Sequence, residues 1–167
     1  MSFFDKLLGV PDPTTEWPAV LGYAPTVEPS LWQFEAPCLG DAVETARFLG
    51  KPDSFSSQNR AKKSFDLMYA SKGLRLRYVE ARLAEITLYI GSSSCEEPGF
   101  VPAEPLAPDG TTLSPDTSRK RLLEIFGTPE PMGSDDEVLQ FFHGNVGCDL
   151  FIDKDGRLES WVMYPND

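Results

Sequence analysis

The feature that most constrains the fold of this chain is a pattern of one helix and three strands that occurs twice. The segment FLGKPD at residues 48–53 returns as IFGTPE at residues 125–130, and in both a glycine and then a proline follow an apolar stretch. Glycine and proline in this order are common signals for the end of a helix. We therefore interpret the two segments as the ends of two copies of one helix, and not as a functional loop used twice. The similar LLGVPD at residues 7–12 is not counted as a third copy, because no matching strands follow it.

Both helices also have recognisable starts. The first is predicted to have Asp41 as its N-cap and to end at Gly50. The second is predicted to have Ser114 as its N-cap, Pro115 at its first position and Gly127 at its end. In each, apolar residues recur at helical spacing on what would be the buried face: Val43, Ala46 and Leu49, then Leu122, Leu123 and Phe126.

Three short strands are predicted after each helix, because apolar and polar residues alternate there. The expected strands are residues 64–70, 73–79 and 82–90 in the first copy and residues 137–143, 148–153 and 157–164 in the second. The last strands align with Tyr89 on Tyr164, whereas the helix ends Gly50 and Gly127 are two positions further apart. The second copy has therefore lost a net two residues, most simply before or within its first strand. A repeat of this length indicates a duplicated supersecondary unit.

These elements predict an α+β protein in which two tandem α-β-β-β repeats form antiparallel sheet with the helices packed on one face. One repeat of about 50 residues buries too little apolar surface to be stable alone, so the two are expected to form one compact domain. The predicted organisation is an N-terminal segment with a helix, a proline-rich stretch and an extra strand (1–37), a first repeat (38–90), a linker rich in Pro, Ser and Gly (91–113) and a second repeat (114–167).

The tandem unit resembles a known family. A glycine-ended helix, an LG-x-P exit and a closing hairpin such as DKDGRLESWVMY are similar to features of the beta-lactamase inhibitor protein fold and of the related small outer-membrane assembly lipoprotein fold. The likeness covers roughly residues 38–90 and 114–164. It implies a protein that binds other proteins across the exposed face of its sheet and carries out no chemistry.

Charge and composition limit the classes of partner. The net charge of −11 argues against a nucleic acid or an anionic membrane as the partner, since both attract clustered Lys and Arg. The charge is uneven, with a basic stretch of +5 at residues 47–90 between acidic neighbours. Only three cysteines occur, without the spacing of a metal or disulfide framework, and the start MSFFDKLLG lacks the apolar run of a signal peptide. We expect a cytoplasmic protein with a protein partner.

No catalytic residue, metal site or cofactor is predicted. The single histidine, His143, lies at the end of a predicted strand and is interpreted as structural, and no glycine-rich phosphate loop is present. The acidic triplet at residues 135–137 is interpreted as solvating a turn. In FIDKDG the calcium-loop register would need acids where Phe151 and Val162 stand, so the segment is interpreted as a tight turn.

The remaining candidate site is one face of the sheet. Leu83, Glu85, Thr87 and Tyr89 are predicted to share this face, as are Leu158, Ser160, Val162 and Tyr164 in the second copy. Tyr and Arg are favoured interface anchors, and basic residues add electrostatic steering. The candidate binding residues are Arg75, Arg77, Glu85, Tyr89 and Tyr164, with Arg82 nearby.

The leading functional hypothesis is a non-enzymatic protein-binding module, for example an inhibitor or an immunity-type protein. The alternative is a small-molecule-binding protein or an enzyme, with a pocket between the sheet and the N-terminal segment lined by Trp17, Trp32 and Tyr89. Whether residues 10–37, including Phe34, cover the candidate face is left open by the sequence.

Overall fold

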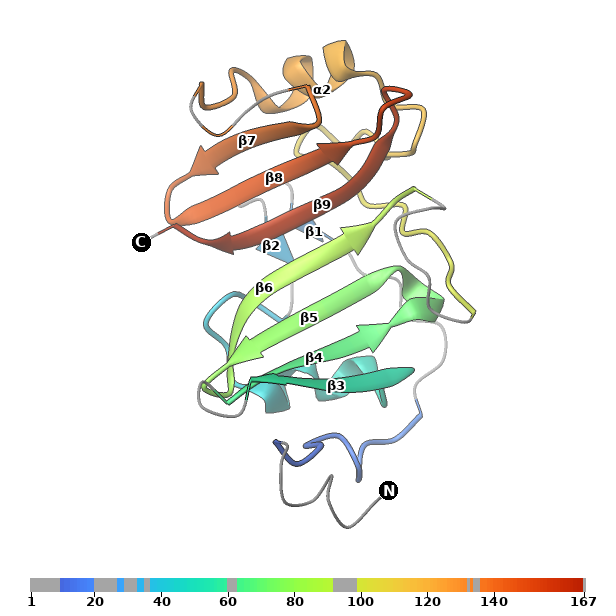
Figure 1. Cartoon of the computed structure of the whole chain (residues 1–167), viewed down its shortest axis with the longest axis vertical. Coiled ribbons are helices and arrows are strands. Elements are labelled where there is room, and N and C mark those ends of the chain that lie inside the picture. The colour runs from blue at the N-terminus through green and yellow to red at the C-terminus, as the bar shows by residue number, and fades with distance from the viewer. Residues whose placement is uncertain are drawn as a thin grey trace.

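The centre of the molecule is an antiparallel sheet of seven strands in the order β3-β4-β5-β6-β9-β8-β7 (Figure 1). The structure is a computed structural model, and it describes residues 10–19, 27–28, 33–34, 37–59, 63–91, 99–131, 133 and 136–166. The strands are β3 (Ser54–Asn59), β4 (Ser64–Tyr69), β5 (Leu74–Val79), β6 (Arg82–Tyr89), β7 (Val138–His143), β8 (Val146–Ile152) and β9 (Leu158–Pro165). All six strands predicted by alternation are present.

Two shorter strands and three helices complete the described elements. Strands β1 (Val27–Glu28) and β2 (Gln33–Phe34) pair only with each other, and β2 falls within the extra strand expected near the end of the N-terminal segment. The helices are the 3-10 helices η1 (Val43–Leu49) and η2 (Ala70–Lys72) and the α-helix α2 (Arg119–Phe126). Within the described residues, no helix is long and apolar enough to cross a membrane. The helix predicted at the N-terminus lies outside the described residues.

Both predicted helix starts are wrong. Ala42 is the N-cap of η1 and makes no side-chain capping bond, because the Asp41 carboxylate instead accepts a hydrogen bond from the Cys38 amide at 2.9 Å. Helix α2 begins at Arg119, because the chain first makes a separate turn in which the Thr117 amide donates to the Ser114 carbonyl. The cap of α2 is Ser118, whose hydroxyl accepts from the Arg121 amide at 3.2 Å.

Both predicted helix ends are confirmed. Gly50 follows η1 with φ of 79°, and Gly127 follows α2 with φ of 88°. Both backbones lie in a region of positive φ that a residue with a Cβ rarely enters, which explains why glycine stands at both places. The backbone therefore has a similar conformation at the end of both helices.

The corrected helix start can be tested with the two serines Ser114 and Ser118. Replacing Ser118 with alanine removes the capping acceptor of α2, so we expect a loss of about 1 kcal/mol in the free energy of unfolding. Ser114→Ala is the matched control and should change stability by less than about 0.5 kcal/mol. Urea unfolding followed by circular dichroism measures both. A larger loss of unfolding free energy for Ser114→Ala than for Ser118→Ala would instead indicate that Ser114 is the N-cap, as predicted from the sequence.

The strands alternate between a buried face and a second face. On β5, Leu74, Leu76 and Tyr78 are buried, while Arg75 and Arg77 on the other face are only partly covered. The buried face joins a core to which the helices contribute Val43, Ala46, Leu49, Leu122 and Phe126. The Phe126 ring of α2 lies 5.4 Å from the ring of Phe141 on β7 and 5.3 Å from that of Trp161 on β9.

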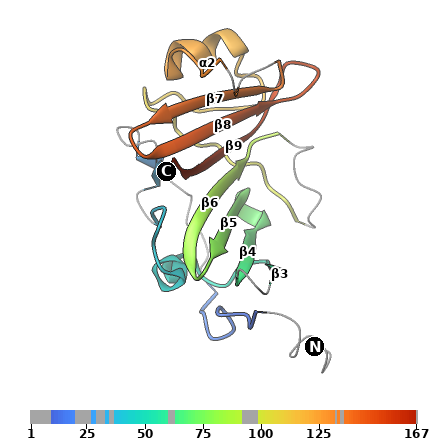
Figure 2. The same ribbon diagram turned by 60° about the vertical axis from the view of Figure 1, so that its left-hand side comes forward.

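Strand β6 meets β9 through four residue pairs: Ile86–Met163, Thr87–Val162, Leu88–Trp161 and Tyr89–Ser160. Thr87 and Val162 are also the residues that coincide when the last strands are aligned in the sequence with Tyr89 on Tyr164. Figure 2 shows that β7, β8 and β9 run at a large angle to β4, β5 and β6, so the sheet is strongly twisted at this junction. Twist of this kind is intrinsic to β-sheets.

Each half of the sheet contains the same irregularity. The pairing of β5 with β6 shifts register between Arg77 and Tyr78, and the pairing of β8 with β9 shifts between Phe151 and Ile152. One extra residue at such a bulge puts the side chains on its two sides along the strand on opposite faces from those that strict alternation would give. As a result Leu83 and Leu158 are buried in the core, and the prediction that they share a face with Glu85 and Ser160 is wrong.

Candidate functional site

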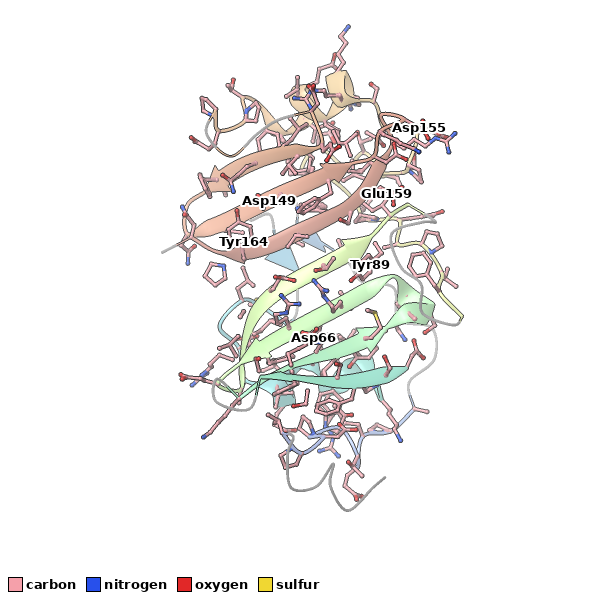
Figure 3. The ribbon with its side chains drawn as sticks, viewed as in Figure 1. Asp66, Tyr89, Asp149, Asp155, Glu159 and Tyr164 are labelled. Atoms are coloured by element: carbon pink, nitrogen blue, oxygen red, sulfur yellow. The ribbon has the colours of Figure 1, made fainter. Side chains whose placement is uncertain are left out.

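The candidate site is the sheet face that lies opposite the core, which we call the open face. Its members follow from the pairing registers, which place Met68, Arg75, Thr87, Val162, Asp149 and Gln140 in one row across six strands. Neighbouring rows hold Asp66, Arg77 and Glu85, then Tyr89, Ser160, Phe151 and Val138, and finally Tyr164, Gly147 and Phe142. In Figure 3 the labelled members Asp66, Tyr89, Asp149 and Tyr164 lie on the side turned toward the viewer.

The described part of the N-terminal segment does not cover the open face. Residues 10–19 lie beside the end of η1, where the Lys51 amide donates to the Pro18 carbonyl at 2.8 Å. Strands β1 and β2 lie behind the large sheet in Figure 1. Trp17 is buried in the core with only 6% of its surface exposed. Among the described residues, no helix or strand lies over the open face in Figures 1 and 3.

A network of ion pairs occupies the half of the open face formed by β4, β5 and β6. Arg75 pairs with Glu85 and also donates to the Thr87 hydroxyl at 3.0 Å. Arg77 pairs with Asp66 at 3.0 Å and with Glu85 at 3.3 Å. The hydrogen bond and the charges of its carboxylate partners raise the pKa of the Arg77 guanidinium, although its partial burial acts the other way. Each charged side chain of this network therefore has a partner of opposite charge within it.

Tyr89 joins this network through its ring. The guanidinium carbon of Arg75 lies 5.9 Å from the centre of the Tyr89 ring, and Phe100 meets Tyr89 edge-on, with 6.2 Å between the ring centres. An arginine over a tyrosine face gains a cation–π attraction. Arg75, Arg77, Glu85 and Tyr89, four of the predicted binding residues, are thus brought together by the fold.

The fifth predicted residue, Tyr164, belongs to a separate cluster on β7, β8 and β9. Its hydroxyl donates to Asp149 Oδ1 at 2.9 Å and accepts from the Gln140 side-chain amide at 2.7 Å. Gln140 also donates to the same carboxylate oxygen at 3.1 Å. The Tyr164 ring lies over Gly147, where a Cβ would come within 2.3 Å of a ring carbon. Glycine at this position is what lets the ring approach the backbone so closely.

The alkaline titration of Tyr164 gives a test of this cluster. Burial, followed by the hydrogen bond and negative charge of Asp149, raises the pKa of Tyr164 from 10.0 to about 12. Since the folded pKa is the higher one, the stabilising contribution is complete below pH 10 and is lost as the pH rises toward 12. We expect the free energy of unfolding to fall less steeply over this interval in Tyr164→Phe than in the unaltered protein.

Burial also raises the pKa values of Tyr69 and Tyr78, so the unaltered protein and the variant will both lose stability in alkali. The measured quantity is therefore the difference between the two slopes, obtained from urea unfolding at several pH values. Parallel slopes would show that the Tyr164 hydroxyl does not titrate as the cluster requires.

Some members of the open face were not singled out from the sequence. Asp66 is the most buried member of the ion-pair network, with 8% of its side chain exposed, and Asp149 and Gln140 hold Tyr164. Their places on predicted strands were a usable signal, because alternation puts them on the face of Arg75 and Arg77. Arg82, in contrast, lies at the exposed start of β6 and donates to the Gly40 carbonyl at 3.3 Å.

The pocket predicted from Trp17, Trp32 and Tyr89 is not formed as described. Trp17 is in the core and Tyr89 is on the open face, while Trp32 lies outside the described residues. A cavity of about 430 Å³ lies elsewhere and is lined by Val10, Lys63, Phe65, Glu80 and Ala81. Within the described residues, no group of His, Cys, Asp and Glu is arranged to hold a metal ion.

Comparison with known proteins adds no family assignment. No family model, curated protein sequence or solved structure matches this chain.

Proposed function

We propose that this chain is a protein-binding module that uses the open face of its seven-stranded sheet to bind a cognate protein. The observation that carries the proposal is a continuous sheet face over which no described helix or strand packs (Figures 1 and 3). Its members include Tyr89, Tyr164, Phe142, Phe151, Met68 and two arginines, with no lysine. The centres of protein interfaces are enriched in these residue types and depleted in lysine.

The distribution of charge also supports the open face as the binding surface. The chain carries a net charge of −11, yet the open face holds two arginines, one glutamate and two aspartates. A nearly balanced face within an acidic protein avoids the cost of burying many unpaired charges on association. Binding through the exposed face of the sheet is also what the resemblance to beta-lactamase inhibitor proteins implies. We further propose an inhibitor or immunity-type role and a cytoplasmic location.

We also propose that the sheet arose by duplication of one helix–meander unit. Leu67 pairs with Leu76 in the first half and Leu139 pairs with Leu150 in the second, so we take Leu67 and Leu139, and likewise Leu76 and Leu150, as equivalent positions. Compared with the spacing of the helix ends, Gly50 and Gly127, the second copy is five residues shorter before its first strand. It regains two residues in the first turn and one in the next, which restores the match of the last strands. Bulges at matching places in both halves support the same history.

The test is capture of the partner from native cells together with mapping of its contact surface. Tagged protein, a variant with Tyr89, Val162 and Tyr164 changed to serine, and a control with Phe48→Ser on η1 would be compared. The unaltered protein and the control are expected to retain one common partner that the triple variant, shown to be folded by circular dichroism, loses. A partner kept by the triple variant, or no partner at all, would contradict the proposal.

A small-molecule-binding role is the second candidate, favoured by the cavity beside Lys63 and Glu80. A ligand that binds only the folded protein must raise its melting temperature. A thermal-shift screen with a metabolite library tests this role, and Phe65→Ala, which changes the cavity wall, should abolish a genuine shift at a temperature where the variant is folded. The absence of any shift across a broad library would count against this role.

A further inference from the structure

The two halves of the open face differ sharply at matching positions. In the half built from β4, β5 and β6, the charged residues are Asp66, Arg75, Arg77 and Glu85. By the same pairings, the corresponding residues on β7, β8 and β9 are Val138, Asp149, Phe151 and Ser160. Four charges that neutralise one another in one half are thus replaced by two apolar residues, a serine and one aspartate in the other.

This difference decides which half is better suited to docking. Covering the first half would desolvate an ion-pair network that has no unmet charge to offer a partner, and removing water from paired charges is costly. The second half instead exposes 41% of Phe142 and 38% of Phe151. Burying exposed aromatic surface is a main source of binding free energy at interfaces. The half around Arg75 and Arg77, which the sequence analysis predicted as the binding area, is therefore less suited to docking than the β7–β8–β9 half.

Asp149 gives the second half an unmet charge. Both of its side-chain hydrogen bonds, from Gln140 and Tyr164, go to Oδ1. No Lys or Arg of the described residues lies within ion-pair distance of its carboxylate. Among the described residues Oδ2 has no cationic partner, so it can accept one from a partner protein, on the same face of β8 as the exposed Phe151.

The residues around Asp149 also carry a net negative charge. Residues 136–166 contain six acids and two bases, whereas residues 63–91 contain three acids and five bases. Asp136 comes just before β7, and Asp153 and Asp155 follow β8, so acids flank the strand ends nearest the pair Val138–Phe151. A partner segment that carries positive charge would be attracted here, while an acidic one would be repelled.

We propose that the docking area is the β7–β8–β9 half of the open face and that its occupant is a basic segment of another protein. Apolar side chains of that segment cover Phe142 and Phe151, and a Lys or Arg of it pairs with Asp149 Oδ2. This inference rests on the proposed protein-binding function and adds to it the place of binding and the chemistry of the partner.

A displayed library of random peptides tests both parts, because it offers basic, neutral and acidic sequences equally to the full chain. We expect the selected peptides to be net positive and to combine Lys or Arg with apolar residues. Their affinity, measured by fluorescence anisotropy, should fall about tenfold or more for the double variant Phe142→Ser and Phe151→Ser. Asp149→Asn should weaken them about threefold or more, and less at high salt.

The matched control is Phe48→Ser, since Phe48 of η1 is 37% exposed, close to the 38% of Phe151, but lies outside the open face. Affinity should stay within about twofold in this variant. Thermal unfolding of all variants establishes that they are folded.

The outcomes separate the two proposals. Binders that are neutral or acidic but lose affinity in Tyr89→Ser would overturn the basic-partner inference and leave the proposed function standing. Self-association through the same residues, seen by light scattering and lost in the double phenylalanine variant, would also overturn the inference, with a second copy as the occupant. Binders unaffected by any open-face variant, or no binders, would contradict both.

Discussion

Replacing Trp161 with alanine is expected to lower the free energy of unfolding by about 3–5 kcal/mol. Trp161 is fully buried on β9, where it pairs with Leu88 on one side and Leu150 on the other. Its ring meets Phe126 of α2 edge-on, at an angle of 85°. The truncation would leave a cavity between the sheet and α2 that neighbouring side chains can fill only in part.

The control is the next residue along the strand. Val162 lies on the open face and is only partly buried, so Val162→Ala should cost less than about 1.5 kcal/mol. Urea unfolding followed by tryptophan fluorescence and circular dichroism measures both variants. Equal losses would show that Trp161 does not occupy the core side of β9.

Replacing Gly73 with alanine is expected to cost about 2–5 kcal/mol, because two separate penalties combine. Gly73 has φ of 60°, a conformation that is unfavourable for a residue with a side chain. An added Cβ would also lie 2.4 Å from the Ala103 amide nitrogen and 2.9 Å from the Tyr89 carbonyl oxygen. Both contacts are to backbone, which cannot move aside as a flexible side chain would.

Gly144→Ala is the control that separates the conformational penalty from the steric one. Its φ is 62°, nearly the same as that of Gly73, but nothing lies within 4 Å of an added Cβ. Gly144→Ala should therefore cost only about 1–2 kcal/mol, the conformational part alone. Thermal unfolding by calorimetry measures the difference between the two variants. If they lose the same stability, residues 101–103 do not pack against Gly73 as the structure shows.

Regular alternation is what made the sheet predictable from the sequence. Leu74, Leu76 and Tyr78 alternate with two arginines, and this pattern placed β5 and its neighbours correctly. Strand β3 was missed because its sequence, SFSSQN, is polar at most positions and is held at the edge of the sheet by pairing with β4 alone. A strand of this kind is specified by its partner rather than by its own apolar pattern.

Two kinds of detail were not predictable from the sequence: the choice between competing local hydrogen bonds, and contacts between strands that are distant in the sequence. Asp41 has the composition of an N-cap, yet its carboxylate binds the Cys38 amide, and sequence alone does not rank these two local bonds. The bulges that bury Leu83 and Leu158 interrupt the two-residue period without any glycine to mark them. The candidate residues Arg75 and Arg77 were placed on the correct face, but their neutralisation by Asp66 and Glu85 needed the strand registers.

The register in which β6 pairs with β9 is the one expected between two copies of the same strand. Thr87 faces Val162, its own counterpart in the alignment of the last strands, and the pairs on either side are exchanged in the same way. Two identical chains related by a two-fold axis would pair their last strands in this manner. If the two halves arose by the proposed duplication, the ancestor would have been a homodimer with a sheet continuous across its interface, and fusion would have let the two copies diverge. A symmetric dimer presents two identical surfaces, whereas a fused chain can carry an ion-pair network on one half of the open face and exposed aromatic residues on the other.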